Sequence, residues 1–244
     1  MIKRIERGYD FGYISTLGGT LTDFVHNGRA ILYPQKSIEK GKKRGGLFFC
    51  FPFFGPSPEE FKDINQHGWL REQELNTYEQ KERCSLILTG SSNPKKSFPW
   101  QMNYSIIYSM LANNCLKASF QVERIDNIED PMPINLGIHP YFNSFGKKRN
   151  LVINDDKIGF HDEAKIIPFE NWRRSLILDL GRETVKMQLG GDFTKKTHLC
   201  LWTDNDQYFC LEPIQTHPDH FNTLQGEFLG KGEKAEFEMY LEVI

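Results

Sequence analysis

The feature that most constrains the fold is a pair of alternating segments on either side of two asparagines. Residues 103–110 place an apolar side chain at every second position, and residues 115–123 repeat this pattern. Successive side chains of a β-strand point to opposite faces, so a period of two predicts a strand with one buried face. Asn113 and Asn114 tolerate the positive φ angles of a tight turn. The two segments therefore predict a long β-hairpin.

Most of the remaining chain also has the pattern of short strands. Asn27-Gly28 predicts a second hairpin between residues 20–26 and 29–33. Nineteen Phe and nine Tyr against only five Ala favour strands, because aromatic side chains pack well on a pleated surface. Further strands are expected at residues 11–17, 84–88, 134–139, 151–154, 176–180, 185–189, 198–203, 208–212 and 235–243.

A single short helix is expected, with Ser57 as its N-cap, Pro58 as its first residue and an end near Ile64. Many short strands with few helices are typical of two antiparallel sheets packed face to face. We therefore predict an all-β fold, a large antiparallel β-sandwich with few short helices, formed as a single domain by residues 1–244.

Charge and cysteine content narrow the function classes. Thirty basic and 32 acidic side chains give a net charge of −2, which argues against nucleic acid or an anionic membrane as partner. The longest apolar run, residues 47–54, is far shorter than the roughly 20 residues of a membrane helix. Five cysteines without metal-site spacing, and no apolar signal region, indicate reduced thiols in a cytoplasmic protein.

Two titratable side chains occupy similar positions on separate predicted strands. His139 and Glu212 each lie on the face opposite to the aliphatic residues of their strand. Each is followed by a proline, Pro140 or Pro213, which we expect to end the strand and open a loop, where functional sites are frequent. Gly137 leaves space beside His139. The plainer interpretation, ordinary polar residues on a solvated face, is favoured by the strand phase alone.

A third cluster combines an amide, an imidazole, an indole and a guanidinium within six residues, namely Gln66, His67, Trp69 and Arg71. Carbohydrate sites use such a mixture, with polar groups for hydroxyls and an aromatic face for C–H groups. A structural loop with a packed Trp69 explains the cluster at least as well. Arg44 follows a basic run that is typical of a solvated loop, although with Arg71 it could hold a phosphate.

Metal and nucleotide chemistry have little support in the sequence. His67, His139 and Glu212 could form a two-histidine, one-carboxylate metal site, but the chain has no His-x-His or His-x-x-x-His pair to support it. The chain contains neither a glycine-rich phosphate loop nor a dinucleotide fingerprint. We therefore expect no metal and no cofactor.

Several short motifs occur in a fixed order along nearly the whole chain. They are Leu17-Gly18-Gly19-Thr20-Leu21, Ile31-Leu32-Tyr33-Pro34, Arg44-Gly45-Gly46 with Cys50-Phe51-Pro52 and Phe54-Gly55-Pro56, Gln66-His67-Gly68 with Arg71, the segment 135–143, and Cys210-Leu211-Glu212-Pro213. Together they resemble the aldose 1-epimerase (mutarotase) superfamily, and within it the hexose-6-phosphate 1-epimerase-like branch. This resemblance implies the galactose-mutarotase-like β-sandwich, also called a supersandwich.

The resemblance also implies roles for individual residues. Glu212 would be the general base, His139 the general acid, and Arg44, Gln66, His67 and Arg71 the substrate contacts. The substrate would be a small-molecule sugar or sugar phosphate. The family also places an aspartate near the sugar, and the sequence leaves four candidates open: Asp156, Asp162, Asp179 and Asp192.

Anomer exchange needs one group to remove the O1 proton and another to protonate the ring oxygen. A carboxylate and an imidazole, with ordinary pKa values of about 4.3 and 6.5, suit these tasks at neutral pH. We expect Glu212 and His139 to meet across a common hollow that a pyranose ring could bridge. Two other classes remain open: a non-catalytic sugar-binding or sensor protein, and a glycoside hydrolase with a second carboxylate about 5–9.5 Å from Glu212.

Overall fold

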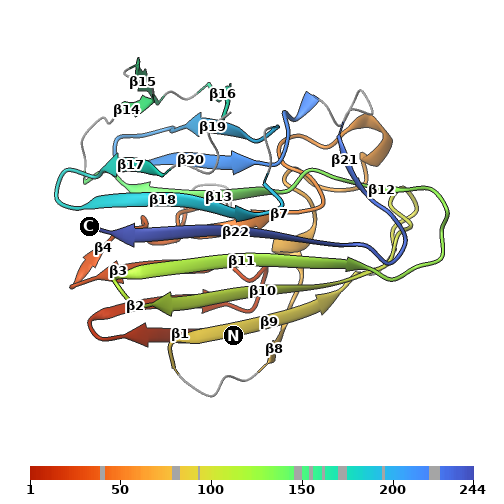
Figure 1. Cartoon of the computed structure of the whole chain (residues 1–244), viewed down its shortest axis with the longest axis horizontal. Coiled ribbons are helices and arrows are strands. Elements are labelled where there is room, and N and C mark those ends of the chain that lie inside the picture. Colours follow the sequence, from red (N-terminus) through yellow and green to blue (C-terminus); the bar gives the residue numbers. More distant parts are fainter. Residues whose placement is uncertain are drawn as a thin grey trace.

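Two antiparallel sheets form the body of the computed structural model, and long strands such as β18, β22, β11 and β10 run alongside one another in Figure 1. The predicted all-β antiparallel fold is confirmed. The structure describes residues 1–38, 42–78, 83–92, 94–145, 150–153, 156–160, 163–169, 175–193, 196–219 and 226–244. No helix in these segments is long and apolar enough to cross a membrane.

The first sheet has nine strands, in the order β1-β2-β3-β7-β13-β20-β19-β16, with β4 paired to β3. Their bounds are β1 (Ile2–Arg7), β2 (Asp10–Ser15), β3 (Leu21–His26), β4 (Arg29–Ala30), β7 (Leu47–Cys50), β13 (Gly137–Asn143), β16 (Lys165–Pro168), β19 (His198–Trp202) and β20 (Tyr208–Ile214). Three strands that are far apart in the sequence, β7, β13 and β20, are therefore neighbours at the middle of this sheet.

The second sheet has seven strands, in the order β17-β18-β22-β11-β10-β9-β8. Their bounds are β8 (Asn76–Tyr78), β9 (Ser85–Ser91), β10 (Met102–Leu111), β11 (Cys115–Arg124), β17 (Leu176–Asp179), β18 (Thr184–Gly191) and β22 (Lys234–Val243). The smaller pairs are β5 (Lys36–Ser37) with β6 (Lys43–Arg44), β12 (Met132–Ile134) with β21 (Glu227–Leu229), and β14 (Asn150–Ile153) with β15 (Asp156–Gly159).

The expected hairpin is the β10–β11 pair of the second sheet. Asn113 and Asn114 take φ angles of 60° and 56°, as the turn requires. The apolar positions of each strand are buried and their neighbours are more exposed, so the period-two pattern predicted both the strands and their buried face. Phe120 of β11 packs on Phe49 of β7 with ring centroids 5.6 Å apart, which joins the two sheets in one apolar core.

The predicted helix over residues 57–64 is wrong in type and length. The segment forms one short 3-10 turn, η2 (Glu59–Phe61), preceded by Pro58. The Ser57 hydroxyl donates a hydrogen bond to the Ile64 carbonyl and therefore makes no N-cap bond. A second 3-10 turn, η3 (Leu70–Glu72), carries Arg71. Because Phe61 and Ile64 are buried, local packing rather than helix propensity sets this conformation.

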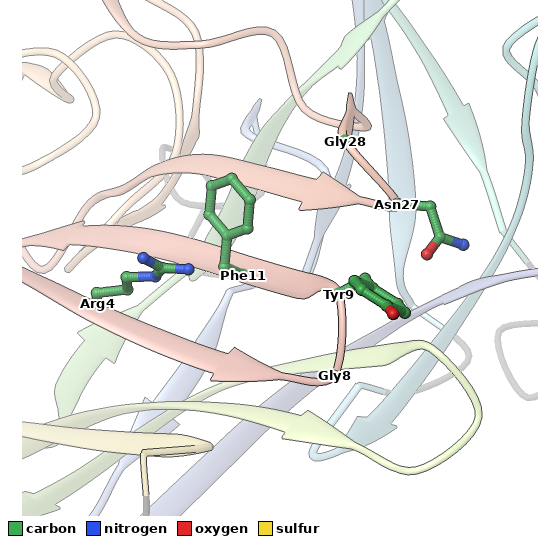
Figure 2. Close-up of a pocket in the computed structure, with 6 residues that line it drawn as sticks. All are labelled: Arg4, Gly8, Tyr9, Phe11, Asn27 and Gly28. Carbon is green, nitrogen blue, oxygen red and sulfur yellow. The ribbon is translucent and has the colours of Figure 1, made fainter.

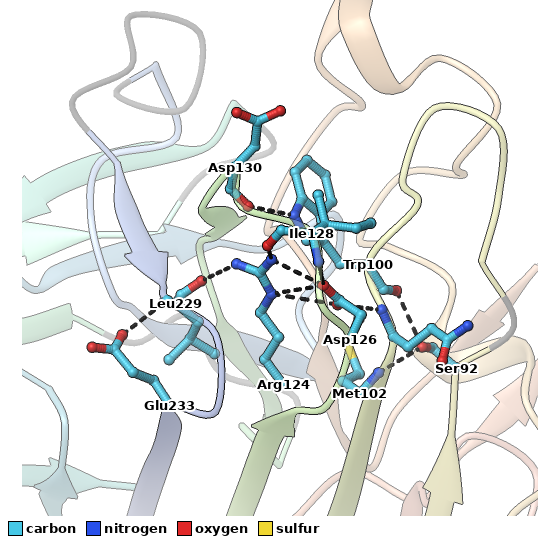
Figure 3. A network of polar contacts seen from close by, with 11 residues as sticks. Ser92, Trp100, Met102, Arg124, Asp126, Ile128, Asp130, Leu229 and Glu233 are labelled. Atoms are coloured by element: carbon cyan, nitrogen blue, oxygen red, sulfur yellow. Dashed lines mark hydrogen bonds and ion pairs between the residues drawn. The ribbon is translucent and has the colours of Figure 1, made fainter.

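A buried arginine ties the end of the second sheet to the loop that follows β11 (Figure 3). Arg124 is fully buried and pairs with Asp126 at 2.9 Å. Its guanidinium also donates to the carbonyls of Leu229, at 3.0 Å, and Ile128. Asp126 in turn accepts the backbone N–H of Gln101 at 2.7 Å and that of Ile128 at 2.9 Å. This network holds three chain segments together through polar contacts.

Candidate functional site

His139 and Glu212 are direct neighbours on adjacent strands. The antiparallel register pairs Tyr141 of β13 with Cys210 of β20. Two residues back along β13 and two forward along β20, the same register sets His139 opposite Glu212. Directly opposed side chains leave a sheet on the same face and touch. His139 Nε2 lies 3.3 Å from Glu212 Oε2.

This contact corrects the expected separation. We predicted a gap that a pyranose ring could bridge, and the two groups instead touch without room for a sugar between them. The reason lies in the register: residues that face each other across two paired strands have Cβ atoms only about 5 Å apart. Strand phase gave the face of each side chain, but it carries no information on which strands are neighbours.

The prediction that Pro140 and Pro213 end their strands is wrong. β13 continues through Pro140 to Asn143, and β20 continues through Pro213 to Ile214. Because proline has no N–H to donate, its presence fits the break in pairing between β13 and β20 over residues 138–140. On its other edge β13 pairs with β7 over this stretch, which keeps the strand in the sheet. The break in the ladder therefore lies at the His139–Glu212 contact.

The pair lies on the face of the first sheet that is turned away from the inter-sheet core. Ile138 and Leu211, the neighbours of His139 and Glu212, point into that core, as the strand phase predicted. The opposite face is nevertheless covered, since His139 is 5% exposed and Glu212 only 2%. The pair is thus closed to bulk solvent, in contrast to the expected hollow.

Aromatic rings surround the His139 imidazole. Phe48 stacks on it with ring centroids 4.7 Å apart, and Tyr141 stacks at 4.8 Å with an interplanar angle of 6°. His67 contacts it at 5.3 Å and Trp202 at 6.4 Å, both in edge-on arrangements. These contacts fix the ring plane and leave Nδ1 buried without a hydrogen-bond partner.

Gly137 leaves room for a side chain from another element, as expected, and that side chain is the Phe54 ring. A Cβ atom at position 137 would lie 2.4 Å from Phe54 Cδ2, closer than real contacts allow. Phe54 in turn packs against His67, with ring centroids 5.1 Å apart. Gly137 therefore allows the cover of the site to close over β13.

Gly137→Ala is expected to destabilise the protein by about 1–3 kcal/mol, because the added methyl group must displace a packed aromatic ring. Gly230→Ala is a suitable control, since its added Cβ would meet only the flexible carboxylate end of Glu233, at 3.1 Å. Urea unfolding of the two variants measures the difference. A Gly137→Ala protein as stable as the control would contradict the packing of Phe54 against this strand.

Burial governs the protonation of the pair. Burial lowers the pKa of His139 well below 6.5, and the charges of His67, Arg44 and Arg71 lower it further. Burial raises the pKa of the Glu212 carboxyl well above 4.5. Both shifts favour the uncharged forms. In the form that these shifts favour, the two groups share one proton, which either of them can carry.

His67 is held in one tautomer beside the pair. The Gly55 N–H donates to its Nδ1 at 3.2 Å, so the proton of the neutral ring is on Nε2. Burial, followed by the charges of Arg71 and Arg44, lowers the pKa of His67 to about 4. The ring is consequently a neutral hydrogen-bond donor at physiological pH. This residue, predicted as a substrate contact, does lie at the site.

The two arginines differ in how their charge is balanced. Arg44 Nε donates to Asp204 Oδ2 at 3.0 Å, and its guanidinium lies 5.1 Å from the centre of the Trp202 ring. Arg71 makes no hydrogen bond or ion pair within the described segments, although its charge reaches His139 and His67. Among the described residues, no carboxylate therefore offsets the charge of Arg71 at the site.

The remaining predictions for this cluster have mixed outcomes. The Gln66 side chain is exposed, and no described interaction links it to His139 or Glu212. Trp69 is 5% exposed and packs against Phe51 and Tyr104, so the packed-loop interpretation is confirmed for this residue. Its indole has no free face for a sugar.

None of the four candidate aspartates is linked to the site by a described interaction, whereas a fifth aspartate, Asp204, pairs with Arg44. Asp204 follows β19, the neighbour of β20, and holds Arg44. No sequence motif marks it, because its place beside Arg44 follows from the order of the strands. Asp179 and Asp192 instead accept backbone N–H groups, from Gly181 at 2.6 Å and Glu236 at 2.7 Å. Asp162 and the side chain of Asp156 lie outside the described residues.

Two other cavities lie away from the pair. One, of about 490 Å³, lies at two hairpin turns of the first sheet and is lined by Arg4, Gly8, Tyr9, Phe11, Asn27 and Gly28 (Figure 2). Its one cationic side chain, Arg4, is already paired with Glu6 at 2.8 Å. The other, of about 730 Å³, is lined mainly by strands of the second sheet. Neither contains any of the six predicted site residues.

Comparison with known proteins identifies the family. The sequence model of the aldose 1-epimerase family matches residues 13–197, about three quarters of the chain. The chain belongs to this family. The match includes Arg44, the 66–71 block and His139, but it ends before Glu212. A sequence comparison with curated proteins found no match.

Solved structures show the same fold at low sequence identity. The Slr1438 protein of Synechocystis sp. PCC 6803 has a TM-score of 0.78 at 19% identity, covering 100% of this chain and 95% of its own. A galactose mutarotase related enzyme from Lactobacillus acidophilus has a TM-score of 0.76 at 16% identity, with coverage of 100% and 97%. Galactose 1-epimerase from Lactobacillus acidophilus NCFM has a TM-score of 0.65 at 11% identity, with coverage of 98% and 92%.

Proposed function

We propose that this member of the family is an aldose 1-epimerase that interconverts the α and β anomers of a hexose or hexose 6-phosphate. In this proposal Glu212 is the general base and His139 the general acid. The observation that carries it is the contact at 3.3 Å between the two groups, in a setting that leaves them one proton to share. Arg44, His67, Arg71 and, at the exposed rim, Gln66 would contact the sugar.

The short separation suits the reaction better than a wide one. The anomeric hydroxyl and the ring oxygen of a pyranose are both bonded to C1, so the base and the acid must act on two atoms of one carbon. Glu212 would remove the O1 proton while His139 protonates the ring oxygen, and the C1–O5 bond breaks to give the open aldehyde. Rotation about C1–C2 then presents the other face of the carbonyl group for closure.

Because the pair shares one proton, the same two groups can catalyse both ring opening and ring closure. Before ring opening, the reactive form has a Glu212 carboxylate and a protonated His139. After ring opening, the proton from O1 is on Glu212 and His139 is neutral. Ring closure reverses both transfers and restores the starting form. The pair therefore needs no proton from solvent during a turnover, which fits its burial.

Substrate binding must uncover the pair, because neither side chain is accessible in this closed form. The rings that contact His139 belong to Phe54, His67 and Trp202, in addition to the two stacked neighbours. His67 and Trp202 are partly exposed, so a sugar could reach these two first. Displacing the cover would exchange apolar ring contacts for contacts with the C–H face of the sugar.

The two arginines at the site are compatible with an anionic substrate and with a neutral one. Arg71 has no carboxylate partner in the described part of the chain, whereas Arg44 is held by Asp204, which would repel a phosphate placed beside it. Comparing kcat/KM for glucose and glucose 6-phosphate by polarimetry tests the substrate class. A preference for glucose 6-phosphate is expected if Arg71 meets the phosphate. Equal rates with both sugars and with galactose would contradict a phosphate contact, and no rate above buffer would contradict the enzyme itself.

A non-catalytic sugar-binding or sensor role is the second candidate function, and the closed state of the pair favours it. Such a protein would bind a sugar saturably without accelerating anomer exchange. Titration calorimetry combined with exchange NMR on the same sample separates the two roles. Binding with an exchange rate equal to that of buffer would replace the enzymatic proposal with this one.

We propose a single domain over residues 1–244, acting on a small sugar rather than on nucleic acid or a membrane. The five cysteines are free in the structure, which supports a reducing compartment such as the cytoplasm.

A further inference from the structure

Three thiols surround the Glu212 carboxyl. Cys210 precedes it by two residues on β20 and faces the same side of the sheet. Cys200 of β19 is its cross-strand partner, and Cys50 belongs to β7 on the far side of β13. All three are buried and free, and the charge of Glu212 acts on each of them. Ring opening of a sugar uses none of these thiols.

Cys210 stands out because it is close to both members of the pair. One nitrogen of His139, the Cys210 sulfur and one oxygen of Glu212 all lie within 4.8 Å of one another. All three side chains are more than nine-tenths buried. The strand register fixes this arrangement. His139 and Tyr141 lie on one face of β13, and they are opposite Glu212 and Cys210 of β20, respectively. The group is thus part of the sheet rather than of a loop.

The donor set is the one that zinc prefers. Zn²⁺ binds imidazole nitrogen at about 2.0–2.1 Å, thiolate sulfur at about 2.3 Å and carboxylate oxygen at about 2.0–2.2 Å, in tetrahedral geometry. Such bonds place the ligand atoms about 3.5 Å apart. The 3.3 Å between His139 and Glu212 already meets this spacing, so only the Cys210 sulfur has to move closer.

His139 is also buried with few polar contacts, which leaves its Nε2 available as a ligand. The ring is 5% exposed, its Nε2 lies 3.3 Å from Glu212 Oε2, and its Nδ1 has no hydrogen-bond partner. A cation bound at Nε2, the nitrogen beside Glu212, would leave Nδ1 to carry the ring proton. Soft thiolate and imidazole ligands select Zn²⁺ over Mg²⁺ or Ca²⁺, which prefer oxygen.

We infer that His139, Cys210 and Glu212 form an inhibitory site for Zn²⁺, with the fourth position open to water. Binding displaces the thiol proton of Cys210 and the proton shared by the pair to solvent, and three bonds to the metal form in their place. The metal would occupy the two atoms that exchange protons with the sugar. The inhibition rests on the proposed epimerase activity, whereas the binding does not.

The test compares the metal-free wild-type protein with Cys210→Ala, Cys210→Ser and the control Cys115→Ser. Cys115 is a partly exposed thiol on β11 of the second sheet, so its removal leaves the site intact. Co²⁺ absorption reports binding, because a thiolate ligand adds an ultraviolet charge-transfer band that carboxylate and imidazole lack. Zn²⁺ affinity follows from competition with a chromogenic chelator. Urea unfolding of each metal-free variant checks that it folds.

The wild-type protein and Cys115→Ser are expected to bind one equivalent of metal with the thiolate band. Both Cys210 variants should lose the band and bind Zn²⁺ at least about tenfold more weakly. Zn²⁺ should slow anomer exchange in the wild type at the concentrations that fill the site. Metal binding that is absent, or unchanged in both folded Cys210 variants, would overturn the site. Filled wild-type protein with full activity would overturn the inhibition, and absence of activity without metal would count against the proposed function alone.

Discussion

Glu212→Gln is expected to lower kcat for anomer exchange by about 10²–10⁴-fold, the usual contribution of a well-placed proton-transfer group. Glutamine keeps the shape of the side chain and its place opposite His139, but it cannot take the O1 proton. The fold should survive, because burial already favours an uncharged group at this position. Polarimetry on freshly dissolved α-glucose and α-glucose 6-phosphate, or on whichever sugar the wild type turns over, measures the loss.

His139→Asn should reduce the rate to a similar level, and the double variant should be hardly slower than either single variant. Groups that exchange one proton act as a unit, so their losses do not add. Glu242→Gln serves as the control, because Glu242 pairs with Lys186 on the second sheet, away from the site. Full activity in Glu212→Gln would remove this carboxylate from the mechanism. Additive losses in the double variant would contradict the shared proton.

Arg124→Met is expected to destabilise the protein by about 3–5 kcal/mol, the usual cost of removing one partner of a buried ion pair. The loss would leave Asp126 without its counter-charge and the Leu229 and Ile128 carbonyls without their donor. Arg4→Met is the matched control, because Arg4 is about half exposed and its pair with Glu6 is solvated. That control should cost at most about 1 kcal/mol. The free energies of unfolding come from urea titration at neutral pH.

The effect of Arg124→Met should also depend on pH. Burial alone would raise the pKa of Asp126, but hydrogen bonds from Arg124 and from the Ile128 and Gln101 amides hold it below 3.8. A carboxyl with a depressed pKa in the folded state stabilises the fold above its unfolded value, and this stabilisation is lost as the pH falls. The wild-type advantage should therefore shrink as the pH falls below about 3.8. A constant difference would show that the loss is one of packing.

The fold was predictable because local patterns agreed with it. The alternation around Asn113 and Asn114 predicted both strands of the β10–β11 hairpin, and strand phase placed His139 and Glu212 on the face away from the core. Such patterns reflect the two-residue period of side chains along a strand, which can be recognised directly in the sequence. The pieces that failed, such as the helix at Ser57, depended on tertiary contacts that local propensity does not include.

The geometry of the site was less predictable, since it depends on strand order. No local pattern in the sequence predicts that β13 lies between β7 and β20. This strand order brings His139 against Glu212 and Phe48. The same order brings Cys210 to the pair and Asp204 to Arg44. Pro140 and Pro213 do not end their strands, because a strand can continue past a proline when its other edge stays paired.

The most direct test is two-dimensional exchange NMR on the anomeric protons of an equilibrated sugar, with wild-type protein added in steps. If Glu212 and His139 shuttle a proton at C1, the α-to-β exchange rate should rise in proportion to protein concentration for glucose, galactose or glucose 6-phosphate. A rate equal to that of buffer with all three sugars, in a sample that NMR shows to be folded, would contradict the account.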